Sequence, residues 1–195
     1  GAAWERRGGG GCYYTAQGAT GLQGDYPGAG EAIGRWTRAG AGPLGIAGEV
    51  DAGDLRAVLA GLAPATGLTP NGTQLSSHAR RVPGFDLTFA VPKSVSVVYG
   101  LGDPLVQATV VEACEAAVAE SLSWLEREAC FVRRGTNNRK MVTDPAGFGT
   151  RRMIAEGFIA AEFSHRTSRL GDPHLHWHVL VANLARGIDG RWTAL

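Results

Sequence analysis

The histidines of this chain are concentrated near its C-terminal end, where their spacing suits metal binding. Four of the five lie between residues 165 and 178, at His165, His174, His176 and His178. The last two are two residues apart and alternate with apolar residues, which is typical of a β-strand. Successive side chains of a strand point to opposite faces, so we expect both imidazoles on one face and the apolar side chains in the core. Two imidazoles on one face can bind the same metal ion.

A third imidazole is available from the segment that precedes this strand. Residues 158–165 can pair with residues 174–181 across a turn at 169–173, which brings His165 beside the other two. A set of three histidines suits Zn, Mn, Ni or Cu, and a substrate phosphate oxygen would make Mg or Mn suitable as well. His174 follows Pro173 at the start of the strand, so we expect it at the rim and not among the ligands. The alternative is that these are ordinary hairpin histidines that bind no metal.

Tyrosines near the N-terminus are the second group capable of chemistry. Tyr13 and Tyr14 follow the glycine run Gly8–Gly11, and Tyr26 lies further along. A tyrosine hydroxyl is a weak nucleophile because its ordinary pKa is about 10. A metal-polarised phosphate, or a base such as Asp86, would make attack by this hydroxyl feasible. Packing or an interface would explain a tyrosine pair equally well.

Composition and charge limit the class of protein. The chain has 195 residues, of which 44% are hydrophobic and 19% are charged, as expected for a globular domain with a buried core. A formal net charge of +1 excludes a strongly polycationic nucleic-acid coat, although arginine clusters can still bind phosphate locally. The three cysteines lack CxxC spacing, and no stretch is long and apolar enough for a membrane span. We therefore expect a cytoplasmic protein without disulfides.

The elements that must position these residues follow from periodicity and capping signals. We predict an α+β domain, an antiparallel sheet with helices on one of its faces. The expected strands are 85–91, 130–134, a segment within 153–167, 175–184, and a return strand that begins at Trp192 after an Asp189-Gly190 turn. The expected helices are 54–62, a short one opening at Ser94, and a long one from Asp103-Pro104 to about Ala129. Asp51 or Asp54 is expected to cap the first helix. Residues 13–50, 63–84 and 135–150 are expected to be loops.

Four segments together resemble one family, the conjugative relaxases of the TrwC/TraI type within the HUH endonucleases. That family's tyrosine motif is similar to CYYTAQ at 12–17, and its next segment is similar to GDYPGAGEAIGRW followed by LGIAGEV. Its central strand and helix resemble GFDLTFAVPKSVS at 84–96. Its three-histidine motif resembles FSHRTSRLGDPHLHWHVLVANL, with DGRW after it. The resemblance runs from Tyr13 to Leu195.

The resemblance implies an HUH relaxase fold, with a palm or ferredoxin-like sheet, and a role for each matching residue. Tyr13 corresponds to the nucleophile, and Tyr26 to the first tyrosine of a second pair that some members use for a second strand transfer. Asp86 corresponds to the acid near the nucleophile and the metal. The ligands of a divalent metal, which is Mg, Mn or Zn, correspond to His165, His176 and His178.

The implied function is that of a conjugative relaxase, which nicks single-stranded plasmid DNA at an origin of transfer. Attack by the tyrosine oxygen on a metal-polarised phosphate leaves a covalent 5′-phosphotyrosine link and a free 3′-hydroxyl. The implied partners are single-stranded origin DNA, a type IV secretion coupling protein and accessory DNA-binding proteins, in the bacterial cytoplasm and without a membrane. The basic residues expected to contact DNA are Arg80, Arg81, Lys93, Arg166 and Arg169. A further arginine group, with either phosphate contact or a solvated surface as its role, is Arg133, Arg134, Arg139, Arg151 and Arg152.

Departures from the family pattern modify this expectation. The residues WERRGGGG stand where family members have a short apolar strand, so residues 1–12 are expected to be a flexible or aberrant segment. The second tyrosine pair is reduced to Tyr26-Pro27, and residues 13–195 are expected to be a C-terminally truncated relaxase catalytic domain. We therefore expect weak or absent nicking. Two alternatives stay open: a degenerate fragment that binds single-stranded DNA without cleaving it, and a hydrolase that uses the histidine site on water.

Overall fold

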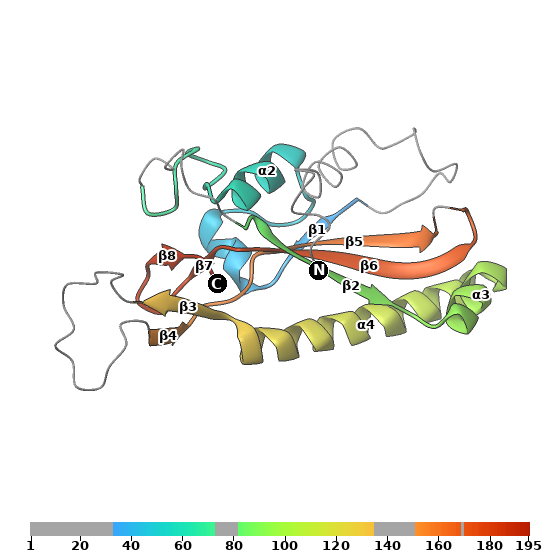
Figure 1. The fold of residues 1–195 in the computed structure, drawn as a ribbon. Helices are drawn as coiled ribbons and strands as arrows, with labels where there is room; N and C mark the ends of the chain where they lie inside the picture. The colour runs from blue at the N-terminus through green and yellow to red at the C-terminus, as the bar shows by residue number, and fades with distance from the viewer. Residues whose placement is uncertain (1–32, 73–81, 135–150, 169) are drawn as a thin grey trace.

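An antiparallel sheet of four strands, in the order β1-β5-β6-β2, is the centre of the fold (Figure 1). The structure is a computed structural model that describes residues 33–72, 82–134, 151–168 and 170–195. The strands are β1 (Arg35–Thr37), β2 (Gly84–Ala90), β5 (Ala160–Thr167) and β6 (Pro173–Ala182). Strands β5 and β6 pair with each other as a hairpin, and β1 and β2 border them on either side. The α+β class and the hairpin predicted from the sequence are confirmed.

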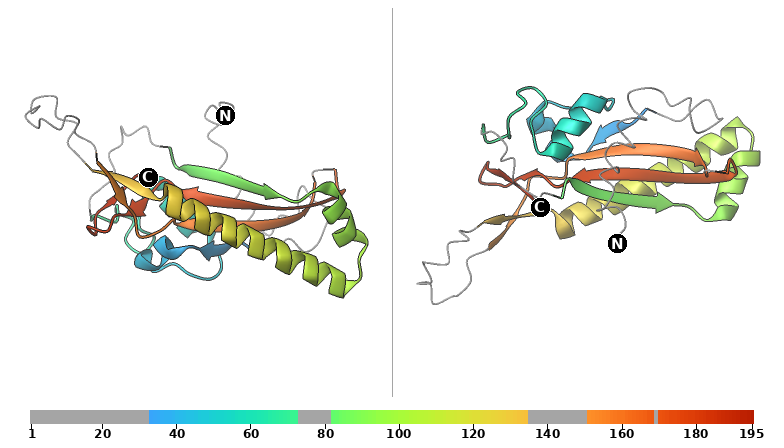
Figure 2. Two further views of the ribbon diagram at one scale, coloured as in Figure 1. Left: turned by 90° about the horizontal axis from the view of Figure 1, so that it is seen from below. Right: turned by 45° about the horizontal axis from the view of Figure 1, so that its top comes forward.

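Helices cover both faces of this sheet. Helix α3 (Lys93–Leu101) and helix α4 (Pro104–Ala129) follow β2, and α4 runs along the length of one face (Figure 2). Helix α2 (Ala52–Ala60) and the 3-10 helix η1 (Ala39–Leu44) lie on the opposite face, toward one end (Figures 1 and 2). The prediction that helices cover one face is wrong. Every residue from 158 to 163 is buried, and a strand buried on both sides needs cover on both faces.

Strand β6 contributes alternate side chains to two buried clusters. Toward α4, Trp177 and Val179 pack with Leu122 of that helix. Toward α2, Leu180 packs with Val58. This alternation is what the period of a strand requires, and it confirms that the apolar residues between the histidines point into the core.

Local capping signals set the helix boundaries. The Asp103 carboxylate accepts hydrogen bonds from Leu105 N and Val106 N, both at 2.9 Å, and α4 begins at the following proline as predicted. Asp51 caps α2, because its Oδ1 accepts from Gly53 N at 2.7 Å, so this helix begins two residues before the predicted start. Within the described segments, no helix combines the length and the apolarity that a membrane span needs.

Short strands account for the remaining differences from prediction. The expected strand within 153–167 is divided into β4 (Arg151–Ile154) and β5, and β4 pairs with β3 (Phe131–Arg134) as a separate ribbon. Strand β1 lies in a segment expected to be loop, since its three residues carry little local signal and pair with β5, which is distant in sequence. The C-terminal hairpin of β7 (Ala185–Arg186) and β8 (Trp192–Thr193) is confirmed, with Gly190 at a φ of 77° in its turn.

Candidate metal centre

Three histidine rings meet on one face of the sheet. His165 of β5 lies directly opposite His176 of β6, and His178 follows two residues along β6. The ring centroid of His165 is 5.1 Å from that of His176 and 5.3 Å from that of His178. The centroids of His176 and His178 are 5.2 Å apart. His165 is buried, with 8% of its surface exposed, whereas the other two rings are half-buried. The hairpin therefore forms a compact triangle of imidazoles that stays open to solvent on one side.

Hydrogen bonds orient two of these rings. Nδ1 of His178 lies 3.0 Å from Oδ1 of Asp86, and Nδ1 of His176 lies 2.8 Å from the carbonyl oxygen of His174. A carbonyl oxygen only accepts, so Nδ1 of His176 carries the proton and donates, which leaves the lone pair on Nε2. An ionised Asp86 selects the same tautomer at His178. Metal-binding histidines typically donate their second ring nitrogen to a carbonyl or carboxylate in this way.

Burial favours the neutral form of His176. Desolvation lowers the pKa of its imidazole, and the neighbouring His165, His178 and His174 lower it further, while the hydrogen bond to the His174 carbonyl partly opposes these effects. A neutral imidazole is the form that binds a metal, because the protonated ring has no lone pair left. The surroundings of His176 therefore favour the metal-binding form near neutral pH.

Helix α3 holds the start of β6 through a buried serine. Strand β2 ends before Pro92, and the last contact along it is Val91 N–H, which donates to the carbonyl oxygen of Leu175 at 3.3 Å. The Ser96 hydroxyl accepts a hydrogen bond from this N–H at 3.0 Å, and Ser96 is completely buried. Leu175 lies between His174 and His176, so this contact fixes the backbone next to the histidine triangle. Sequence analysis missed Ser96. The signal that points to it is the proline, which ends β2 while β6 continues.

A β-bulge lies beside the same contact. His165 is opposite His176, whereas Thr167 is opposite Pro173, so β6 has one extra residue at this point. His174 lies in the bulge, and its carbonyl oxygen accepts the hydrogen bond from the ring of His176. The ring centroid of His174 is 4.7 Å from that of His176. Sequence analysis placed His174 at the rim and gave no role to its backbone, because a bulge depends on strand register, which is non-local.

The other predicted site residues fall into two groups. Lys93 donates a hydrogen bond to the carbonyl oxygen of Pro173 at 2.7 Å and forms an ion pair with Asp172, so it helps to hold the β5–β6 turn. Asp172 also accepts a hydrogen bond from the Ser168 hydroxyl. Arg166 is exposed on β5. The predicted residues that lie outside the described part of the chain are Tyr13, Tyr26, Arg80, Arg81 and Arg169.

The donor chemistry of the triangle fits a divalent metal. In the segments that the structure describes, no group of three or more His, Cys, Asp or Glu side chains is arranged to hold a metal ion. The centroids of three imidazole rings nevertheless lie within 5.3 Å of one another. In two of these rings Nδ1 is hydrogen-bonded to an acceptor, so Nε2 is left to bind a metal. Nitrogen donors suit Zn, Mn or Cu, whereas Mg needs additional oxygen ligands, which a phosphate and water can supply.

Comparison with known proteins gives a consistent match. The family model described as TrwC relaxase matches residues 7–195. The multifunctional conjugation protein TraI of Escherichia coli is 34% identical over 161 residues, which is 83% of this chain. A metal-free structure of conjugative relaxase TrwC in complex with OriT DNA is 29% identical, covers 93% of this chain and has a TM-score of 0.67. A metal-bound structure of TrwC with OriT DNA is 32% identical, covers 84% of this chain and has a TM-score of 0.65.

These relatives are longer than the chain. It spans 8% of TraI, and 57% and 51% of the two TrwC chains. The family model nevertheless covers nearly the whole of this sequence, including the histidine hairpin and the strand that carries Asp86. The chain belongs to the TrwC relaxase family.

Proposed function

We propose that this chain is the catalytic part of a conjugative relaxase, which nicks one DNA strand at an origin of transfer. The triangle of His165, His176 and His178 beside Asp86, in a chain of the TrwC family, is the observation that carries the proposal. The related TrwC structures are complexes with OriT DNA, and one of them is metal-bound. We therefore assign single-stranded origin DNA as the substrate and a divalent metal as the cofactor.

The histidine triangle is the site we assign to that metal, with the three Nε2 atoms as ligands. A divalent ion bound there would withdraw electron density from a scissile phosphate. Asp86 positions His178 by accepting a hydrogen bond from its Nδ1–H, so the ring keeps one orientation and one tautomer. The His174 carbonyl does the same for His176. The protein thus presents a fixed set of neutral donors.

Tyr13 is the nucleophile in this proposal. Its hydroxyl oxygen attacks the phosphorus, the bond to the 3′ oxygen breaks, and the 5′ phosphate remains on the tyrosine. The tyrosine proton passes to a base, for which Asp86 is our candidate, and the departing 3′ oxygen takes up a proton to become a hydroxyl. Because one phosphodiester replaces another, the strand can be rejoined by the reverse step. Tyr26 is the candidate for a second strand transfer.

The proposal also implies a cellular setting. We place the chain in the bacterial cytoplasm, where it meets single-stranded DNA, a type IV secretion coupling protein and accessory DNA-binding proteins. Arg80, Arg81, Arg166 and Arg169 are our candidates for contacts with the DNA backbone. Lys93 is a further candidate for contact with the DNA backbone, at the β5–β6 turn that it holds through Pro173 and Asp172.

A covalent-adduct assay tests this function. The chain is incubated with an oligonucleotide that carries the transfer origin of its own genetic element, with Mn or Mg, and the products are separated under denaturing conditions. We expect a protein–DNA band that Tyr13→Phe removes and that His176→Ala greatly weakens. The same band from Tyr13→Phe would refute the nucleophile assignment. A free 5′ phosphate without adduct would favour the hydrolase, and tight binding without any product would favour the non-cleaving fragment.

A further inference from the structure

Three side chains of β2 border the histidine triangle on the same face of the sheet. Thr88 is directly opposite His178 and Ala90 is directly opposite His176, so both share a face with the triangle, as does Asp86 two residues earlier. All three are exposed, and β2 is the last strand of the four-stranded sheet. A ligand that reaches the triangle from this side meets short side chains. Of these three, with Asp86 ionised, only Thr88 has a side-chain proton to donate.

The Thr88 hydroxyl and the Asp86 carboxylate both lie near one ring nitrogen of His178. Oγ1 of Thr88 is 3.3 Å from Nδ1 of His178, and the two carboxylate oxygens of Asp86 are 3.0 and 3.2 Å from the same nitrogen. An ionised carboxylate only accepts, and it is the closer and stronger acceptor, so Nδ1 carries the proton and donates it to Asp86. Toward this nitrogen the Thr88 oxygen is therefore at most a second, longer acceptor.

This arrangement leaves the hydroxyl proton of Thr88 without a use inside the described part of the chain. A hydroxyl has one proton to donate and two lone pairs. Because Nδ1 of His178 already carries a proton, the Thr88 O–H cannot donate to it. Among the residues that the structure describes, the contact with His178 is the single hydrogen bond of this hydroxyl. Since Thr88 is exposed, its proton is open to an acceptor on the histidine face.

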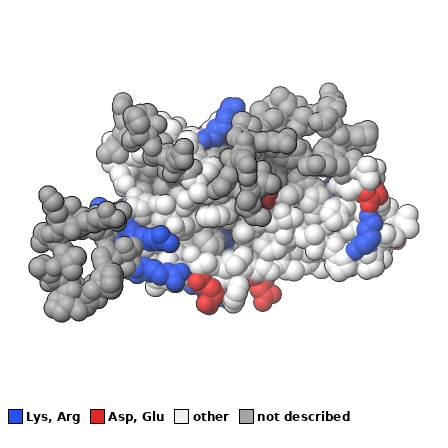
Figure 3. Space-filling model, viewed as in Figure 1, with Lys and Arg blue, Asp and Glu red and all other residues white. Residues whose placement is uncertain are grey.

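The charges around this end of the sheet suit a neutral donor. In the view of Figure 3, the described Lys and Arg side chains lie mainly toward the β3–β4 ribbon, and a smaller group lies at the α3 end. Lys93, the first residue of α3, is paired with Asp172 and donates to the carbonyl oxygen of Pro173 at 2.7 Å. That cation is therefore already engaged. Threonine hydroxyls are common donors to the phosphate oxygens of DNA, and the Thr88 hydroxyl remains open to such an acceptor.

We propose that Thr88 contacts the substrate, its hydroxyl donating a hydrogen bond to a non-bridging oxygen of the DNA phosphate held at the histidine triangle. The assignment of DNA as the source of this phosphate rests on the proposed function. Thr88 and Asp86 then have different roles beside the same ring, because Asp86 orients His178 and Thr88 faces the DNA. A contact with the backbone carries no sequence information, so it adds affinity to any strand that places a phosphate there.

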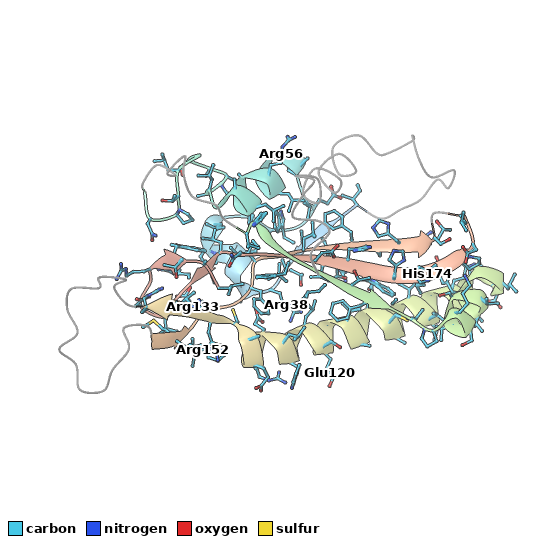
Figure 4. All side chains as sticks on the ribbon, in the orientation of Figure 1. Arg38, Arg56, Glu120, Arg133, Arg152 and His174 are labelled. Carbon is cyan, nitrogen blue, oxygen red and sulfur yellow. The ribbon has the colours of Figure 1, made fainter. Side chains whose placement is uncertain are left out.

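Three variants isolate the hydroxyl. Thr88→Val keeps the branched shape and removes the hydroxyl, and valine suits a strand, so circular dichroism should show the wild-type Tm. Thr88→Ser keeps the hydroxyl. Thr109→Val is the matched control, because Thr109 is exposed on α4 and its hydroxyl donates to the carbonyl oxygen of Leu105 at 2.8 Å. Figure 4 shows α4 on the other side of the sheet from His174, which adjoins the triangle.

Two titrations are made on each variant. The first measures Mn affinity, and the second measures binding of a labelled mixed-sequence single strand by fluorescence anisotropy, with saturating Mn, between about 50 and about 200 mM salt. Loss of a hydrogen bond to a charged group should make DNA binding by Thr88→Val about 10- to 100-fold weaker. The slope of log affinity against log salt should not change, because a neutral hydroxyl releases no counterions. Mn affinity should stay at the wild-type value, and Thr88→Ser should retain most of the DNA affinity.

Each outcome decides the proposal. Weaker DNA binding by Thr88→Val, with wild-type salt slope and Mn affinity, supports the contact. Wild-type DNA affinity in Thr88→Val, an equal loss in Thr88→Ser or Thr109→Val, or no DNA binding by the wild-type chain overturns it. A loss of Mn affinity in Thr88→Val also overturns it, because the hydroxyl would then position His178. The covalent-adduct assay is scored separately. Weaker DNA binding by Thr88→Val in a chain that forms no adduct keeps the contact and removes the relaxase function, whereas adduct formation with wild-type DNA affinity does the reverse.

Discussion

Replacing Ser96 by alanine tests whether helix α3 positions the metal centre. The Ser96 hydroxyl accepts the backbone N–H of Leu175, and Ser96 and Leu175 are 0% and 1% exposed. Alanine removes the acceptor and offers no other, so the N–H between His174 and His176 becomes a buried donor without a partner. For this N–H to reach another acceptor, the bulge at His174 must move, and the carbonyl oxygen of His174 is what orients the ring of His176.

The magnitude can be worked from this one contact. A buried donor left unsatisfied costs about 1–3 kcal/mol. For a chain of 195 residues, each kcal/mol lowers Tm by about 2–4 °C, so Ser96→Ala should lower Tm by about 2–12 °C. Loss of an outer contact that orients a metal ligand typically weakens metal affinity by about 10- to 100-fold. We expect a metal-affinity loss in this range in addition to the loss of stability.

Two measurements on the same variants separate positioning from stability. Thermal unfolding is followed by circular dichroism without metal, and Mn or Co affinity is measured by titration at a temperature where every variant is folded. Ser94→Ala is the control, because Ser94 lies on the same helix and is exposed. Ser96→Thr keeps an acceptor oxygen and should recover metal affinity. A lower Tm with wild-type metal affinity would refute the positioning role, and a wild-type Tm would refute the buried hydrogen bond itself.

Two other substitutions test the electrostatics of the molecule. Asp86→Asn removes the charge that accepts the His178 proton, so titration should show metal affinity lowered by about 10- to 100-fold, and an unchanged affinity would show that Asp86 does not orient the ring. The Arg134 guanidinium holds the pKa of Asp189 below its usual range, so the ion pair adds stability above the unfolded-state pKa of about 3.9 and loses it as pH falls through the lower folded value. Asp189→Asn should therefore flatten the decrease in Tm on acidification, and a pH profile parallel to wild type would contradict this.

Local signals in the sequence were sufficient for the central elements. The alternation of Leu175, Trp177 and Val179 with histidines predicted a strand and its buried face, since these side chains are 1%, 1% and 0% exposed. Asp103 followed by Pro104 predicted the start of α4, because a capping carboxylate and a proline at the first helical position act locally. Strand β1 was not predictable in this way. Its residue Trp36 pairs with Ala161, and only the presence of β5 makes that segment a strand.

In the candidate site, too, some features follow from local sequence and others depend on contacts between segments distant in sequence. Parity along one strand placed His176 and His178 together, and the expected hairpin added His165. The partners of these rings depend on strand register, so neither the bulge at His174 nor the hydroxyl of Ser96 carried a local signal. The arginine group divides likewise. Arg133 and Arg134 are adjacent and identical in sequence, yet only Arg134 faces Asp189.

One face of β6 carries both core residues and the proposed metal ligands, and this arrangement makes the histidine triangle rigid. Leu180 and Ala182 are buried in the cluster that includes α2, whereas His176 and His178, earlier on the same face, are half-buried and lie outside that cluster. The opposite face of the strand is buried in the cluster that includes residues of α3, α4 and β3, through Leu175, Trp177, Val179 and Val181. The histidines therefore project from a backbone that packing holds on the far side and that Ser96 holds near its start, while Asp86 orients the ring of His178. A site built on such an element keeps its donors oriented before a metal or DNA arrives, which limits the reorganisation that binding requires.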